Sequence, residues 1–179
     1  MIEKYFCIIF VSKIKNSSKK MKKFILTYFA VIAITAISTA QIKVYKGTSS
    51  YNSDVICNVC EFKIYKKNSN YSSDVICNIN ENIIYKGTSS YSSDVLFNIE
   101  DGKVYKGTSS YSSDIIMTIK DGKIYKGTSS YSSDVIATLK DWKVYDGNSS
   151  YSCDIEFTID GYVTIQEFVA IWYAVKYSY

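Results

Sequence analysis

The stretch DGKIYKGTSSYSSDVIATLK, residues 121–140, decides the fold, because close copies of it fill most of the chain. Five other copies of this 20-residue unit begin at Gln41, Glu61, Glu81, Asp101 and Asp141, and a seventh begins at Gly161 but soon departs from the pattern. A single unit of this length cannot bury its own apolar face. The six units, residues 41–160, are therefore predicted to share one hydrophobic core.

Each unit is predicted to contribute two β-strands. Asp101-Gly102 and Asp121-Gly122 stand between β-prone runs, and Asp-Gly is typical of a type I′ hairpin turn. In the unit quoted above, a first strand is expected over residues 123–126 and a second over residues 134–140, with a polar loop between them.

Alternation of apolar and polar residues assigns one side of the second strand to the core. The assigned core-facing residues are Val55, Val75, Val95, Ile115, Val135 and Ile155 at its start, Cys57, Cys77, Phe97, Met117, Ala137 and Phe157 in its middle, and Val59, Ile79, Ile99, Ile119, Leu139 and Ile159 at its end. The opposite side is polar, with Asn58, Asn78, Asn98, Thr118, Thr138 and Thr158.

Two all-β architectures fit six hairpin units: an axial array, like a flower or a barrel, and an open β-solenoid with one unit per coil. The axial array is favoured because it leaves no open sheet edge. The tandem YKGTSSYSSDV units, followed by DGYVTIQEFVAIWYAV, resemble the small secreted bacterial repeat proteins called β-flowers over about residues 41–176. The resemblance implies an all-β rosette of hairpins, and it implies no activity.

Residues 161–179 are predicted to form a turn and a short helix that plugs or caps the β-array. Apolar residues recur there at helical spacing, and Thr164 with Glu167 forms a capping box before a helix of about 11 residues. Asp160, Gly161, Thr164 and Glu167 also imitate the end of a calcium-binding loop. The turn and the capping box account for these residues, so no metal site is predicted.

Residues 1–40 have the composition of a leader. Met21-Lys22-Lys23 and the apolar run that follows are typical of a signal peptide, with Met21 as the expected true start and cleavage expected before Gln41. A retained membrane anchor is the alternative. Without the leader, 14 lysines remain against 16 acidic residues, a net charge of −2. We therefore expect a secreted or periplasmic protein that does not span the membrane once processed and does not bind nucleic acid.

The composition disfavours an enzyme. The chain has no His, which is the commonest general base and metal ligand. Cys57, Cys60, Cys77 and Cys153 do not form a disulfide framework, and the side chains of the Cys57–Cys60 pair should face opposite sides of a strand. No metal or other cofactor is predicted. A hydrolase whose site surrounds Trp142, with Asp146 nearby, remains as an alternative.

The polar loop of each unit is the candidate binding surface. Its residues recur at fixed positions: Tyr51, Tyr71, Tyr91, Tyr111, Tyr131 and Tyr151, with Asp54, Asp74, Asp94, Asp114, Asp134 and Asp154. Tyrosine rings can stack on a sugar while hydroxyls and carboxylates take its hydrogen bonds, so a carbohydrate or a cell-surface polymer is the expected partner. The alternatives are that Ser and Asp close their own turns in a structural or self-associating protein, or that the aspartates collect cations. The oligomeric state stays open.

Overall fold

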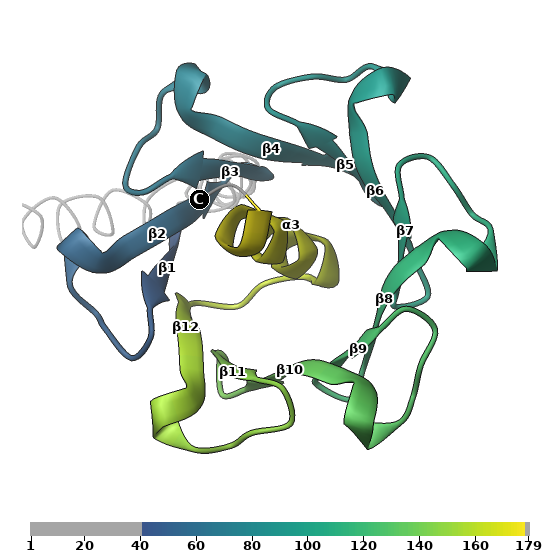
Figure 1. Cartoon of the computed structure of the whole chain (residues 1–179). Helices are drawn as coiled ribbons and strands as arrows, with labels where there is room; N and C mark the ends of the chain where they lie inside the picture. Colours follow the sequence, from purple (N-terminus) through teal and green to yellow (C-terminus); the bar gives the residue numbers. More distant parts are fainter. Residues whose placement is uncertain (1–40, 178–179) are drawn as a thin grey trace, which may run out of the picture. The chain divides into compact units, whose positions relative to one another are not determined.

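The computed structural model describes residues 41–177, which form a closed ring of hairpins around a central helix (Figure 1). The predicted leader, residues 1–40, and residues 178–179 lie outside the described residues. The strands are β1 (Ile42–Lys46), β2 (Val55–Cys60), β3 (Lys63–Lys66), β4 (Val75–Asn80), β5 (Ile83–Lys86), β6 (Val95–Glu100), β7 (Lys103–Lys106), β8 (Ile115–Lys120), β9 (Lys123–Lys126), β10 (Val135–Lys140), β11 (Lys143–Asp146) and β12 (Ile155–Asp160).

The twelve strands make one closed antiparallel barrel. Each strand pairs with its sequence neighbours, and β1 pairs with β12 to complete the ring, with Val44 opposite Ile159. Closure satisfies the backbone groups that an open sheet edge would expose. The axial arrangement predicted from the repeat is confirmed, and the solenoid is not the fold.

Two-residue turns join the units, as the Asp-Gly pairs predict. Glu100 pairs with Lys103, so only Asp101 and Gly102 lie in the turn between β6 and β7, with φ of 48° and 74°. Positive φ at both central residues defines the type I′ turn. A Cβ atom at Gly102 would approach the carbonyl oxygen of Ile119 to 2.6 Å, which explains the preference for glycine there.

A β-bulge in the second strand of each unit corrects one part of the core assignment. Val44 pairs with Cys57 but Tyr45 pairs with Val55, so Ile56 is the extra residue. Cross-strand partners share a face of the sheet, and Val55 therefore lies on the outer face with Tyr45. The assignment to the core face is wrong for Val55 and, through the same register shift, for Val75, Val95, Ile115, Val135 and Ile155.

The middle and end residues of the second strand face the core as predicted. They meet the residues on the inner face of the first strands, namely Val44, Ile64, Ile84, Val104, Ile124 and Val144, none of which is exposed. The bulge residues Ile56, Ile76, Leu96, Ile116 and Ile136 also pack against this core. In the sixth unit, Glu156 takes the bulge position.

The helix α3 (Ile165–Tyr177) runs inside the barrel. Of the two predicted roles, plug and cap, it therefore has that of a plug. Its 13 residues exceed the expected 11, and the capping box forms, with Thr164 N donating to Glu167 Oε2 at 2.8 Å and Glu167 N donating to Thr164 Oγ1 at 3.2 Å. Its buried residues are Phe168, Val169, Ala170, Ile171, Trp172 and Ala174. A helix that is apolar on most sides is stable only when surrounded, and the barrel surrounds this one.

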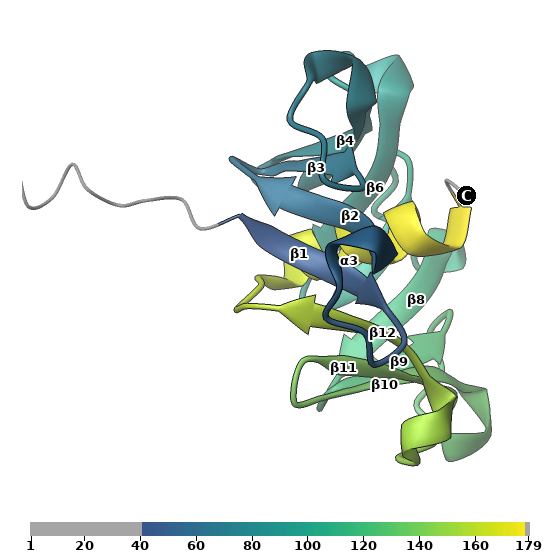
Figure 2. The same ribbon diagram turned by 90° about the vertical axis from the view of Figure 1, so that its left-hand side faces the viewer.

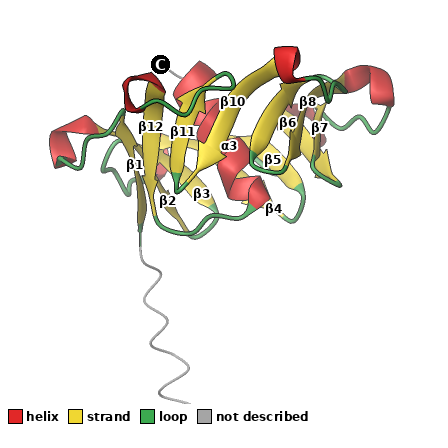
Figure 3. Ribbon diagram, turned by 90° about the horizontal axis from the view of Figure 1, so that it is seen from below, coloured by secondary structure: helices red, strands yellow, loops and turns green. Residues whose placement is uncertain are grey.

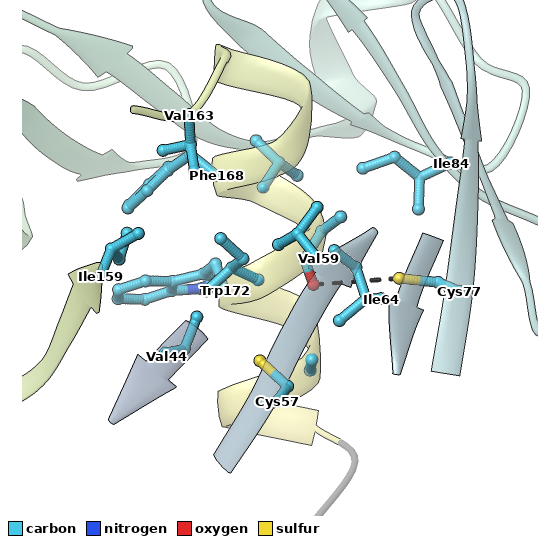
Figure 4. Packing of buried hydrophobic residues seen from close by; sticks show 14 of the residues in the cluster. Val44, Cys57, Val59, Ile64, Cys77, Ile84, Ile159, Val163, Phe168 and Trp172 are labelled. Atoms are coloured by element: carbon cyan, nitrogen blue, oxygen red, sulfur yellow. Dashed lines mark hydrogen bonds between the residues drawn. The ribbon is translucent and has the colours of Figure 1, made fainter. Parts of the chain in front are cut away.

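The helix packs mainly against one side of the barrel. Its contacts are mainly with β2, β3, β4 and β5. Cys57 and Cys77 face it there, and the Cys77 thiol lies 3.9 Å from the carbonyl oxygen of Ala170 (Figure 4). Trp172 reaches toward the other side, where its ring centroid lies 6.4 Å from that of Phe157. Cys77 thus lies close to the helix backbone, and Trp172 and Phe157 fill part of the space on the other side.

The two ends of the barrel differ. The long loops of the units and the end of α3 lie at one end, and the hairpin turns lie at the other (Figures 2 and 3). We call these the loop end and the turn end. Across residues 41–177, no helix has the length and apolar character needed to cross a membrane.

Candidate functional site

The polar loops form six equivalent petals, each closed by the same hydrogen bonds. We use petal for residues 47–54, 67–74, 87–94, 107–114, 127–134 and 147–154, each ending in a short 3₁₀ helix. In the third petal, Ser89 Oγ donates to Asp94 Oδ2 at 2.5 Å, Tyr91 N donates to Ser89 Oγ at 3.2 Å, and Asp94 N donates to Tyr91 O at 3.0 Å. The repeated aspartate therefore holds its own petal in shape.

Each petal is also hydrogen-bonded to the second strand of the preceding unit in the ring. Asn58 Nδ2 donates to the carbonyl oxygens of Lys67 and Ser69, both at 2.8 Å, and Thr118 Oγ1 donates to Gly127 O at 2.7 Å. Thr158 Oγ1 makes the equivalent bond to Gly47 O at 2.7 Å and so links the last strand to the first petal. The polar face of the second strand is used to fix the petals.

The petal tyrosines are exposed. The exposed fraction of each lies between 72% and 75%, for Tyr51, Tyr71, Tyr91, Tyr111, Tyr131 and Tyr151. By contrast, Tyr45, Tyr65, Tyr105 and Tyr145 on the first strands are buried on the outer face of the sheet. The structure thus separates the two tyrosine sets: one packs, and the other stands on a fixed loop.

The aspartates do not share the exposure of the tyrosines. All six are half-buried, and each of them accepts a hydrogen bond from the serine five residues before it. A carboxylate that is bonded within its own loop has less capacity for a ligand than a free one. Of the predicted site residues, the tyrosines are thus exposed, whereas the aspartates are bonded within their own petals.

Sequence reasoning missed a set of lysines at the loop end. Lys46, Lys66, Lys86, Lys106 and Lys126 end the first strands, pair with residues that face the core, and are exposed. A hollow of about 480 Å³ beside α3 is lined by Lys46, Lys67, Asp54 and Glu156, among others. The recurrence of lysine every 20 residues is visible in the sequence, but its place at the barrel mouth depends on the register.

The structure separates the residues of the alternative hydrolase site. Trp142 lies in the turn before β11, where its ring meets Tyr162 edge-on at 5.4 Å, and Asp146 ends the same strand at the loop end. The two residues thus lie at opposite ends of the barrel. They do not form one local site.

The cysteines lie where the strand geometry predicts. Cys57 is buried, Cys60 is half-buried and belongs to the other face of β2, and none of the four described cysteines is in a disulfide. Burial raises the pKa of the Cys57 thiol to about 12, and burial, followed by the nearby Cys57, raises that of Cys77 further. Such thiols stay neutral and are poor nucleophiles.

The calcium-loop imitation has a structural explanation. Both Thr164 N and Thr164 Oγ1 donate to Glu167 Oε2, at 2.8 and 2.9 Å, so the carboxylate caps the helix. Within residues 41–177, no group of three His, Cys, Asp or Glu side chains is arranged to hold a metal ion.

Comparison with known proteins agrees with the fold. The family described as 6-fold beta flower protein matches residues 44–172. Neither the curated proteins nor the solved structures give a match to this chain. The family match runs from the first strand into the central helix and covers well over half of the sequence, and the chain therefore belongs to the six-fold β-flower family.

Proposed function

We propose that the protein is a secreted or periplasmic, non-enzymatic binding module whose petals hold a carbohydrate or another polar cell-surface polymer. The observation that carries the proposal is the exposure of all six petal tyrosines on loops that internal hydrogen bonds keep in one shape. A loop that already has one shape loses little conformational entropy on binding, and a tyrosine side chain has only two torsion angles to fix.

The repetition of the petals also supports a polymeric ligand. The six petals surround the barrel (Figure 1), and each carries one exposed tyrosine, so neighbouring petals can engage successive units of one polymer chain. Weak contacts of this kind reinforce each other when their geometry allows simultaneous binding. A catalytic site would instead require a unique group of ionisable residues, and the departures from the repeat at Trp142 and Asp146 lie apart.

The test is binding of the purified protein to a broad glycan array, compared with a variant that carries Tyr91→Ser, Tyr111→Ser and Tyr131→Ser. We expect the parent to bind a glycan class and the variant to lose most of that binding. Because the tyrosine rings are exposed, the free energy of unfolding of the variant should lie within about 0.5 kcal/mol of that of the parent. A matched control changes the exposed turn-end residues Glu100, Lys120 and Lys140 to Ser and should bind like the parent.

Two results would contradict the proposal. If no glycan binds and the tyrosine variant is markedly less stable, the tyrosines are part of the scaffold. If sedimentation instead shows oligomers that the tyrosine variant no longer forms, the petals serve self-association.

A further inference from the structure

The barrel register places a ring of positive charge inside the ring of petals. Lys66 is the partner of Cys57 and Lys86 is the partner of Cys77, so both lie on the inner face of the sheet, at the last residue before the petal. The equivalent positions in the ring hold Lys46, Lys106, Lys126 and, in the sixth unit, Asp146. Five of six positions around the mouth are therefore cationic.

Within the described part of the chain, these lysines form no ion pair with a carboxylate. Within residues 41–177, the one ion pair joins Lys176 at the end of α3 to Glu156, which occupies the bulge position of the sixth unit. The petal aspartates are bonded to their own serines. Unpaired cations that line a concave surface concentrate their field on whatever enters it.

A second hollow at the mouth provides a place for an anionic group. It has a volume of about 260 Å³ and is lined by Lys66, Lys86, Gly87, Val75, Ile76 and Tyr173. No acidic residue lines it, whereas Asp54 and Glu156 line the larger hollow beside Lys46 and Lys67. Tyr173 comes from α3 and stacks against Tyr177, with ring centroids 6.0 Å apart. Two ammonium groups, a phenol and apolar walls suit a sugar that carries a carboxylate or a sulfate.

Lys67 adds to the positive charge of the mouth. All five other petals begin with Gly at φ of 53° to 59°, and Lys67 takes the same left-handed conformation at φ 51°. Such an angle is energetically unfavourable for a non-glycine residue. At this position the chain adds a sixth lysine to the mouth, on the wall of the larger hollow.

We propose that the ligand of the petal face is an acidic polysaccharide, whose carboxylate or sulfate groups are held by Lys66 and Lys86 while the petal tyrosines contact its sugar rings. This inference rests on the proposed function and adds the charge of the ligand. Lys46, Lys67, Lys106 and Lys126 attract the same polymer around the rest of the mouth, and Asp146 repels it.

The experiment measures the affinity of the purified protein for dextran sulfate and for uncharged dextran, which share a backbone, at several salt concentrations. The parent should bind dextran sulfate at least tenfold more tightly than dextran. Lys66→Gln with Lys86→Gln should reduce the affinity for dextran sulfate about tenfold and lower its salt dependence, because fewer counterions are released. The control, Lys120→Gln with Lys140→Gln at the exposed turn end, removes the same charge and should bind like the parent.

A gain-of-function variant makes the test independent of any loss of folding. Asp146→Lys completes the ring of six lysines at an exposed position and should strengthen the binding of dextran sulfate severalfold. Polygalacturonate, which carries carboxylates, is the second probe and should show the same dependence on Lys66 and Lys86.

The possible failures are distinguishable. Equal binding of dextran and dextran sulfate, lost in the Tyr91, Tyr111 and Tyr131 variant, would keep the proposed function and overturn this inference. An equal loss of affinity for dextran sulfate in the mouth variant and in the turn-end variant would mean that the binding is unspecific charge attraction, and it would overturn this inference. Tighter binding of single-stranded polythymidine than of either acidic polysaccharide, through the same lysines, would replace the polysaccharide by nucleic acid. Absence of binding to every probe would overturn this inference, whereas the proposed function would fail only if the broad glycan array also showed no binding.

Discussion

Single residues that depart from the repeat carry much of the information about this protein. Lys67 stands where the first, third, fourth, fifth and sixth petals have Gly47, Gly87, Gly107, Gly127 and Gly147, yet its backbone keeps the left-handed conformation. A non-glycine residue pays about 1 kcal/mol for that conformation. The fold tolerates the cost because Asn58 and the neighbouring strand fix the petal.

We predict that Lys67→Gly stabilises the protein by about 1 kcal/mol, because it removes this strain. Urea unfolding, followed by circular dichroism, measures the change. The matched opposite variant is Gly87→Lys, which should destabilise the protein by a similar amount. A Cβ atom there would lie 3.9 Å from the nearest carbonyl oxygen, so it would not clash, and the cost would come only from the φ of 55°. An unchanged stability in both variants would show that the petal relaxes around the side chain.

The two buried thiols predict a loss of stability at high pH. Below the ordinary thiol pKa of 9.0, Cys57 is protonated in both the folded and the unfolded chain and adds no pH dependence. Between 9.0 and about 12 the unfolded chain releases the proton while the folded chain keeps it. The free energy of unfolding therefore falls there by about 1.4 kcal/mol per pH unit for each buried thiol.

Unfolding at several values of pH between 9 and 11 checks this expectation. Cys57→Ala should lower the slope of stability against pH by about 1.4 kcal/mol per unit, whatever it does to the stability itself. Cys153→Ala, at an exposed position, is the control and should keep the slope of the parent. An identical slope in all three proteins would mean that water reaches Cys57 in the folded state.

At the scale of elements, the central helix and the barrel depend on each other. The barrel interior is too wide to be filled by its own side chains alone, and α3 occupies the space with residues between Ile165 and Val175, about three turns of helix. Trp172 contacts Phe157 from the last strand and Phe168 from its own helix, and Lys176 lies 5.0 Å above its ring. The helix is thus part of the core and not a lid.

Trp172→Ala is expected to destabilise the protein by about 3–5 kcal/mol, because a rigid ring of strands cannot collapse onto the cavity that it leaves. Thermal or urea unfolding gives the value. On the same helix, Tyr177 is 66% exposed, and Tyr177→Ala should cost less than about 0.5 kcal/mol. A small effect of Trp172→Ala would indicate that the helix can shift within the barrel to fill the space.

At the scale of the molecule, closure makes the six units one cooperative structure. Every unit pairs with both neighbours, and the bond from Thr158 to Gly47 joins the ends of the ring. The diameter of a barrel grows with the number of its strands. A ring of five units would therefore be too narrow for the helix that six units enclose.

Deletion of residues 101–120, one whole unit, should abolish the cooperative native state, with loss of the near-ultraviolet circular dichroism of the packed aromatic residues. The control replaces the same residues with a second copy of residues 121–140 and keeps six units. It should retain a closed barrel and one cooperative transition, at a lower midpoint because Met117 becomes Ala. A cooperative transition in the deletion variant would show that a barrel of ten strands can close.

The sequence alone determined the repeat, the two strands per unit, the turns and the helix, because each depends on local chemistry. Asp101-Gly102 accepts positive φ, Thr164 and Glu167 cap a helix, and apolar residues at helical spacing follow them. The exposed petal tyrosines could be named in the same way, since they recur in a polar loop.

The tertiary structure decided which face each strand residue takes, where the helix lies and which side chains meet at the barrel mouth. The bulge at Ile56 moves Val55 to the outer face. The local sequence does not predict this bulge, because Val55 and Ile56 are both apolar. Lys66 on β3 and Lys86 on β5 come together only through the pairing of both strands with β4. Local propensities are read along the chain, whereas pairing and closure depend on residues that lie 20 or more positions apart.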